Sequence, residues 1–200
     1  MRSPLDDWRP WDPDRAAVAE GVAIVYWRFR TVLGLYIQNA DGPDEIALRA
    51  DLADPANARL RRQVVAHELG HRALHRGSHV PVLRCDLVDA ALSNRADLDA
   101  ERWGGERLCP PEVVREFFER AEAVGPEGVA DLADRCGVTP EWLTWWLGDL
   151  RRRGVVKDEW GRGLHQALVP HMPNGRFLDV AEQRAARLKV YGYDPQEGDQ

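Results

Sequence analysis

The sequence predicts an α+β fold that is mainly helical. Most of its apolar residues recur at the three- and four-residue spacing of amphipathic helices, and two short β-rich segments flank a turn near residue 40. The 200 residues are 44% hydrophobic and 30% charged, a balance typical of globular proteins. A chain of this length can form one fair-sized domain, or one domain with a small appendage.

The N-terminal part is expected to contain a helix and a β-hairpin. Residues 1–13 are rich in Trp and Pro and are interpreted as an irregular lead-in, after which Asp12-Pro13 is a start signal for a helix over 14–29. Residues 31–38 and 45–51 resemble strands, and the Asn, Gly and Pro between them suit a turn. These two strands are therefore predicted to pair as a hairpin.

The rest of the chain is predicted to be helical apart from a looser stretch at 77–93. The predicted helices cover residues 56–75, 94–108, 112–124, 127–153 as a pair around Gly137, and 177–190, followed by a polar end. In domain terms, we expect a core over 14–124 and a helix-turn-helix-like C-terminal region over 125–200.

The helix predicted at 56–75 carries the pattern His67-Glu68-x-x-His71. Four residues span about one helical turn, so the two imidazoles project side by side and can share one metal ion. Glu68 points elsewhere around the helix, where a carboxylate suits a general base acting on water rather than a third ligand. The pattern indicates a metal-dependent hydrolase.

A plainer interpretation is that this short pattern arose by chance on a partly exposed helix face. The neighbours favour the metal site, because apolar side chains surround the pair and Gly70 leaves room for a close-packed partner. A catalytic zinc also needs a third protein ligand and an open position. His75 lies about 12 Å along the helix from His67, too far to share one ion, and is expected to be a polar or hydrogen-bonding residue at the helix end.

The third ligand is therefore expected from another helix. His79 lies beyond the helix stop at Gly77 and is expected to be a loop residue. A metzincin would carry its third histidine at position 77, where this chain has Gly77. On the helix predicted at 94–108, Asp97 falls nearer the apolar stripe than Asp99 or Glu101, which makes Asp97 the first choice and Asp99 the alternative.

Two segments resemble the ImmA/IrrE metallopeptidases. These are "VVAHELGHRALH" and "DLDAERWGGERLCPP", and the second follows the family's Glu-x-x-Ala-Asn/Asp-x-aromatic-Ala-Ala-x-x-Leu-x-Pro pattern in register. Asp97 stands at that family's metal-binding acid, with Asp in place of Glu. Glu101 replaces Asn or Asp, and two glycines replace two alanines. The similarity covers roughly residues 20–150.

The resemblance implies a zincin-like fold and a bound divalent metal, zinc or alternatively manganese. It also implies endopeptidase activity toward a helix-turn-helix repressor of a mobile element or stress regulon, with Glu68 as the general base and His67, His71 and Asp97 as metal ligands. The repressor would be the protein partner. A different class of function, a metal-containing module that docks a repressor, toxin or antitoxin without cutting it, has less use for Glu68.

Charge and composition narrow the alternatives. The net charge of −6 and the acidic balance of residues 127–159 argue against direct DNA binding, and Trp142, Trp145 and Trp146 are expected to be core residues.

No apolar run approaches a membrane span, and the N-terminus lacks a signal-peptide pattern, so we expect a cytoplasmic protein. Cys85, Cys109 and Cys136 are too dispersed to suggest a disulfide framework or a thiolate zinc site. The sequence does not predict the oligomeric state.

Overall fold

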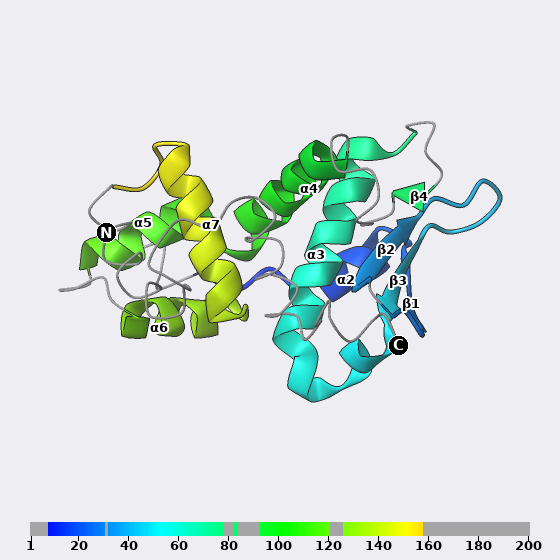
Figure 1. Cartoon of the computed structure of the whole chain (residues 1–200), viewed down its shortest axis with the longest axis horizontal. Helices are drawn as coiled ribbons and strands as arrows, with labels where there is room; N and C mark the ends of the chain where they lie inside the picture. The colour runs from blue at the N-terminus through cyan, green and yellow to red at the C-terminus, as the bar shows by residue number, and fades with distance from the viewer. Residues whose placement is uncertain (1–7, 31, 78–81, 84–92, 121–125, 158–200) are drawn as a thin grey trace, which may run out of the picture.

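The computed structural model describes residues 8–30, 32–77, 82–83, 93–120 and 126–157. Within them the fold is α+β and mostly helical, which confirms the predicted class at that level. Figure 1 shows the sheet on one side of helix α3 and the remaining long helices on the other. The regular elements are α2 (Pro13–Ala19), β1 (Ala23–Trp27), β2 (Gly34–Ile37), β3 (Glu45–Arg49), η1 (Ala50–Ala53), η2 (Pro55–Asn57), α3 (Ala58–His75), β4 (Val82–Leu83), α4 (Ser93–Leu108), α5 (Pro111–Arg120), α6 (Pro126–Cys136) and α7 (Pro140–Arg152).

The prediction of a helix over residues 14–29 is wrong in its second half. Its start is as expected, because the Asp12 side chain accepts hydrogen bonds from the backbone of Asp14 and Arg15 behind a proline at the first turn. The helix stops at Ala19, and Gly21 adopts a left-handed φ of 71°. Residues 23–27, rich in β-branched and aromatic side chains, form strand β1 instead.

The predicted hairpin is confirmed as β2 and β3, which pair antiparallel. It belongs to a larger sheet of strand order β1-β3-β2-β4, in which β1 runs parallel to β3 and β4 pairs antiparallel with β2. The short strand β4 falls within the stretch predicted to be loose. The sequence therefore predicts the centre of the sheet but neither edge strand.

Helix α3 lies between the two hydrophobic clusters of the structure. Val65 and Leu69 belong to a cluster with the sheet and α2, whereas Ala66 belongs to a cluster with residues of α5, α6 and α7. Because both sides of α3 are covered, most of the residues from Gln63 to His71 are buried. The helix that carries the histidine pair is thus the centre of the fold.

A buried polar group ties the C-terminal end of α3 to the hairpin. The Tyr36 hydroxyl donates to the Asp44 carboxylate over 2.9 Å, and the Arg72 guanidinium donates to the same Oδ2 over 3.2 Å. Burial, and then the hydrogen bond to Asp44, raises the pKa of Tyr36 to about 12. The phenol therefore stays protonated and keeps donating throughout the neutral range.

The helical half agrees with the predictions within a few residues. Thr139 caps α7 by accepting a hydrogen bond from the Trp142 backbone, and Gly137 takes the left-handed turn between α6 and α7. Trp142 and Trp146 are buried, as expected for core residues, whereas Trp145 is only partly buried and packs against the same cluster. The helix predicted at 177–190 and the polar end lie outside the described residues. The predicted boundary between 124 and 125 also lies outside them and stays a prediction.

Two glycines allow α3 and α4 to cross in close contact. A Cβ added at Gly70 would lie 2.5 Å from the Ala100 carbonyl oxygen and 2.8 Å from its Cα, both backbone atoms. A Cβ added at Gly104 would lie 3.2 Å from the Ala66 backbone. The helices can approach this closely because one of them has no side chain at each contact point.

Replacement of Gly70 by alanine is expected to force the two helices apart. Because the obstructing atoms belong to the Ala100 backbone, we expect a loss of about 1–3 kcal/mol in the free energy of unfolding, measured by urea denaturation. Gly148→Ala on α7 is the matched control, since its added methyl meets only the flexible end of Arg152 and should gain up to about 1 kcal/mol. A Gly70→Ala protein as stable as wild type would contradict the close crossing.

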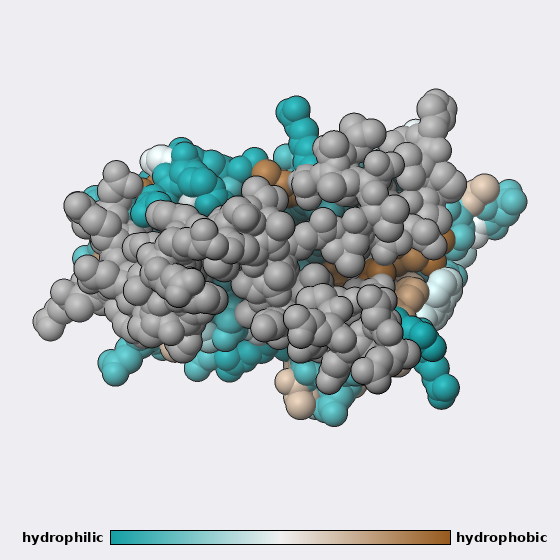
Figure 2. Space-filling view, viewed as in Figure 1, coloured by the Kyte–Doolittle hydropathy of each residue, from teal (hydrophilic) through white to brown (hydrophobic). Residues whose placement is uncertain are grey.

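The described surface carries both hydrophilic and hydrophobic side chains (Figure 2). Figure 2 shows hydrophilic side chains at the margins of the face in view. Among the described residues, the large hydrophobic side chains that are exposed are Val18, Tyr26, Trp27 and Leu74. No helix in the described part of the chain is long and apolar enough to cross a bilayer. Cys109 and Cys136 are buried free thiols, and Cys85 lies outside the described residues.

Candidate metal centre

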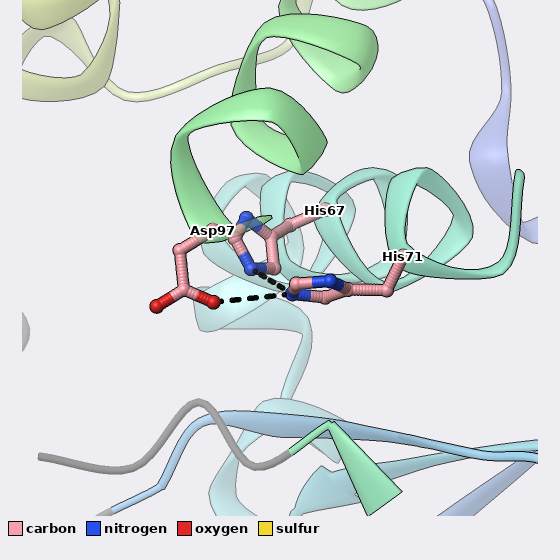
Figure 3. A group of neighbouring side chains, drawn as sticks. All are labelled: His67, His71 and Asp97. Atoms are coloured by element: carbon pink, nitrogen blue, oxygen red, sulfur yellow. Dashed lines mark hydrogen bonds and ion pairs between the residues drawn. The ribbon is translucent and has the colours of Figure 1, made fainter. Parts of the chain in front are cut away.

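Helix α3 places the two histidines of the His-Glu-x-x-His pattern side by side. Their Nε2 atoms are 3.0 Å apart, and the two rings meet edge to face with centroids 4.6 Å apart. His71 is 1% exposed, because the sheet side and α4 enclose this part of the helix. Figure 3 shows both rings projecting from the same side of α3, as the four-residue spacing predicts.

Helix α4 brings Asp97 to the same point. Its Oδ1 lies 3.3 Å from the Nε2 of His71, and ligand atoms of His67, His71 and Asp97 all lie within 4.8 Å of one another. Figure 3 shows the carboxylate reaching the two rings from the neighbouring helix. Of the two acids left open by the sequence, the structure brings Asp97 into the cluster and does not group Asp99 with it.

The donor set fits a zinc ion. Zinc takes imidazole nitrogen and carboxylate oxygen at about 2.0–2.2 Å, so two ligands of a tetrahedral site lie about 3.3 Å apart. The His67–His71 and His71–Asp97 separations of 3.0 and 3.3 Å are close to that edge length. Three protein ligands from two helices would leave the fourth position open, which is the arrangement of catalytic rather than structural zinc sites.

Glu101 contacts Nδ1 of His67, the ring nitrogen that does not face His71. The Nδ1–H of His67 donates to Glu101 Oε2 over 2.6 Å. Burial by itself lowers the pKa of His67, but the hydrogen bond to Glu101 and the charges of Glu101, Glu68 and Asp97 outweigh it and raise that pKa to about 9. At pH 7 the metal-free ring is therefore protonated on both nitrogens, and a metal would displace the proton on Nε2. The hydrogen bond to Glu101 retains the proton on Nδ1, so Nε2 is the nitrogen that faces the cluster, as in metal-binding histidines generally.

His75 contacts the Nδ1 edge of His71, as Glu101 contacts the Nδ1 edge of His67. The two Nδ1 atoms are 3.2 Å apart, so His75 contacts the ring edge that faces away from Asp97. Burial, followed by the nearby His71, lowers the pKa of His75, which keeps its imidazole neutral at pH 7. A neutral His75 can accept the Nδ1–H of His71. It thus lies outside the cluster, as its distance along the helix predicts, and contacts one of its members.

Glu68 is buried against the sheet, with 1% of its surface exposed. A Cβ added at Gly34 on strand β2 would lie 2.8 Å from Glu68 Oε1 and 2.4 Å from a methyl group of Val64. Gly34 therefore provides the space between α3 and the sheet in which this side chain fits. The carboxylate lies on the sheet side of the helix and is not part of the histidine–aspartate group.

A scan against protein-family models finds no match, and no curated protein matches the chain. The interpretation of the site consequently depends on its own geometry and on the sequence patterns described above.

The predicted residues His67, Glu68, His71 and Asp97 all lie on the helices expected for them. The contact of Glu101 with His67 was not predicted. A signal was present, because Glu101 follows Asp97 by four residues, as His71 follows His67. Two acids at that spacing share a helix face, so one can contact the metal while the other contacts a ligand. His79 lies outside the described residues.

Proposed function

We propose that the chain is a zinc-dependent endopeptidase of the ImmA/IrrE type with a zincin-like core. The observation that carries this proposal is the convergence of His67, His71 and Asp97 from two helices, with Glu68 adjacent in sequence to the first histidine. The sequence pattern of α3 and α4 supports the same family. Manganese is the alternative ion, since imidazole and carboxylate ligands also suit it.

In the proposed reaction, the ion would be held by His67, His71 and Asp97. The residues around these three side chains would orient them. When bound, zinc would supply Lewis acidity toward a peptide carbonyl and toward water. Glu68 accepts a proton from the attacking water and delivers it to the departing amine. Its burial between α3 and β2 restricts the carboxylate to one side of the cluster and shields it from bulk water.

We further propose a helix-turn-helix repressor as the substrate and the cytoplasm as the site of action. The resemblance of the two sequence segments to ImmA/IrrE peptidases supports this assignment. The acidic charge of the chain favours a protein partner over DNA. A regulatory peptidase of this kind would cut one substrate at few positions, so generic protein substrates are a poor assay.

The direct test is cleavage of a helix-turn-helix repressor encoded near the gene. The zinc-loaded chain is expected to convert it into a few discrete fragments, identified by intact-mass measurement. Chelation with EDTA should stop cleavage, and added zinc should restore it, with manganese compared in parallel. A repressor that is bound and released from its operator while its mass stays intact would instead support the non-cleaving module.

A further inference from the structure

The carboxylate of Glu101 is shared between two helices besides its own. Its Oε2 accepts the Nδ1–H of His67 on α3 over 2.6 Å, and its Oε1 accepts the indole N–H of Trp142 on α7 over 2.6 Å. Each oxygen therefore has a short hydrogen bond to a ring nitrogen. The three residues form a continuous chain from the metal cluster to the second helix of the C-terminal pair.

This chain is largely removed from solvent. Trp142 is 4% exposed, and the side chains of His67 and Glu101 are 15% and 17% exposed. Charge-assisted hydrogen bonds are short and strong, and water competes poorly for them at such low exposure. Both ring partners therefore help to orient the Glu101 carboxylate.

An adjacent ion pair fixes α7 against α4. Arg102, the residue after Glu101, donates from Nε and Nη2 to both oxygens of Asp149 on α7, over 3.0 and 2.8 Å. Asp149 is fully buried. Because this bidentate contact lies beside the Glu101–Trp142 contact on the same helix, α7 has a defined position relative to the cluster.

We propose that Glu101 and Trp142 are positioning residues of the metal centre, so that α7 helps to determine its metal affinity. Trp142 orients the Glu101 carboxylate, and Glu101 fixes the ring plane and tautomer of His67 so that Nε2 faces His71 and Asp97. The inference rests on the proposed function only in requiring that this cluster bind metal. In this proposal, the helix-turn-helix-like region contributes to metal binding and need not contact DNA.

Trp146 provides the matched control for Trp142. It lies one turn further along α7, stacks on Trp142 with centroids 6.2 Å apart, and is equally buried. Its indole N–H donates to the Cys109 carbonyl oxygen, within the helical core. Replacing Trp146 by phenylalanine therefore removes a buried indole hydrogen bond from the same helix without touching Glu101.

The experiment measures zinc affinity by competition with a chelating dye, together with the melting temperature. Glu101→Gln is expected to weaken zinc binding about 10–100-fold, and Trp142→Phe about tenfold. Trp146→Phe should lower the melting temperature but leave the affinity within about twofold of wild type, because the hydrogen bond that it removes goes to Cys109 and not to Glu101. The visible absorption of bound Co²⁺, which reports ligand geometry, should shift in Glu101→Gln and not in Trp146→Phe.

The double variant Glu101→Gln, Trp142→Phe separates orientation from packing. A glutamine can offer its amide oxygen to His67 only by turning its NH₂ group toward the indole N–H, where two donors oppose each other. Phenylalanine removes that opposition, so the double variant should bind zinc more tightly than Glu101→Gln alone. This partial rescue would not follow if Trp142 contributed only to packing.

Two results would overturn the inference. One is an unchanged zinc affinity in Trp142→Phe, and the other is an equal loss in Trp142→Phe and Trp146→Phe. If the wild-type chain binds no stoichiometric zinc, both this inference and the proposed function fail. If it binds zinc with the expected ranking of variants but leaves the repressor intact, the positioning role stands and only the peptidase proposal fails.

Discussion

Glu68→Gln is expected to abolish peptide-bond cleavage while leaving the bound metal and the fold intact. Glutamine keeps the size of the side chain and fits the same space beside Gly34, but its amide cannot accept a proton from water. General base catalysis typically contributes about 10²–10⁴-fold, so the cleavage rate should fall by that factor. The measurement is the rate at which repressor fragments accumulate under saturating zinc.

The control for this prediction is Glu106→Gln on α4. Glu106 forms an exposed ion pair with Arg153 and lies outside the cluster, so its replacement should leave the cleavage rate near that of wild type. Zinc content and melting temperature are compared for all three proteins. Equal relief of repression by wild type and Glu68→Gln, without any cleavage, would favour the docking module.

Loss of the histidine pair is expected to remove the metal altogether. The purified wild-type chain should hold about one divalent ion, and the His67→Ala, His71→Ala double variant should hold none, because one carboxylate cannot retain the ion alone. The measurement is elemental analysis by plasma mass spectrometry after dialysis. Zinc at 100 times its Kd should also stabilise wild type by about 2.7 kcal/mol. Thermal melting of the double variant should not respond to zinc.

The acids of α4 give this prediction an internal control. Asp97→Ala should weaken zinc binding by more than about 100-fold, beyond the usual effect of losing a residue that only contacts a ligand. Asp99→Ala, two residues along the same helix, should bind zinc as wild type does. The opposite ranking would transfer the ligand role to Asp99. Stoichiometric metal in the histidine double variant would disprove the site.

The predictable parts of the fold are those determined by local spacing. Helix α3 could be located because its apolar residues follow the helical period and Gly77 ends it. The same logic failed at residues 23–27, where a run of apolar residues has no period that separates a buried helix from a strand. Its pairing with β3, about twenty residues away, decides the outcome, and single-segment spacing does not encode that pairing.

In the candidate site too, residues placed by spacing within one helix could be predicted, and contacts between helices could not. His67 and His71 lie on one helix and could be predicted from their spacing, and Asp97 could be chosen because it lies near the apolar stripe of α4. The contact between His67 and Glu101 joins residues 34 positions apart, and that between Glu101 and Trp142 spans 41. These contacts depend on how α3, α4 and α7 cross, which amphipathic patterns leave undetermined.

The division of the ligands between α3 and α4 also has a consequence for chain entropy. An ion held by His71 and Asp97 would close residues 72–96 into a loop, in the manner of a covalent staple. Closing such a loop costs little chain entropy in the folded protein, where Gly70 and Ala100 already hold the helices together. It costs far more in an unfolded chain, which would therefore not retain the ion. Metal release and separation of the two helices would then be one cooperative event, and the lifetime of the folded chain would follow the availability of the metal.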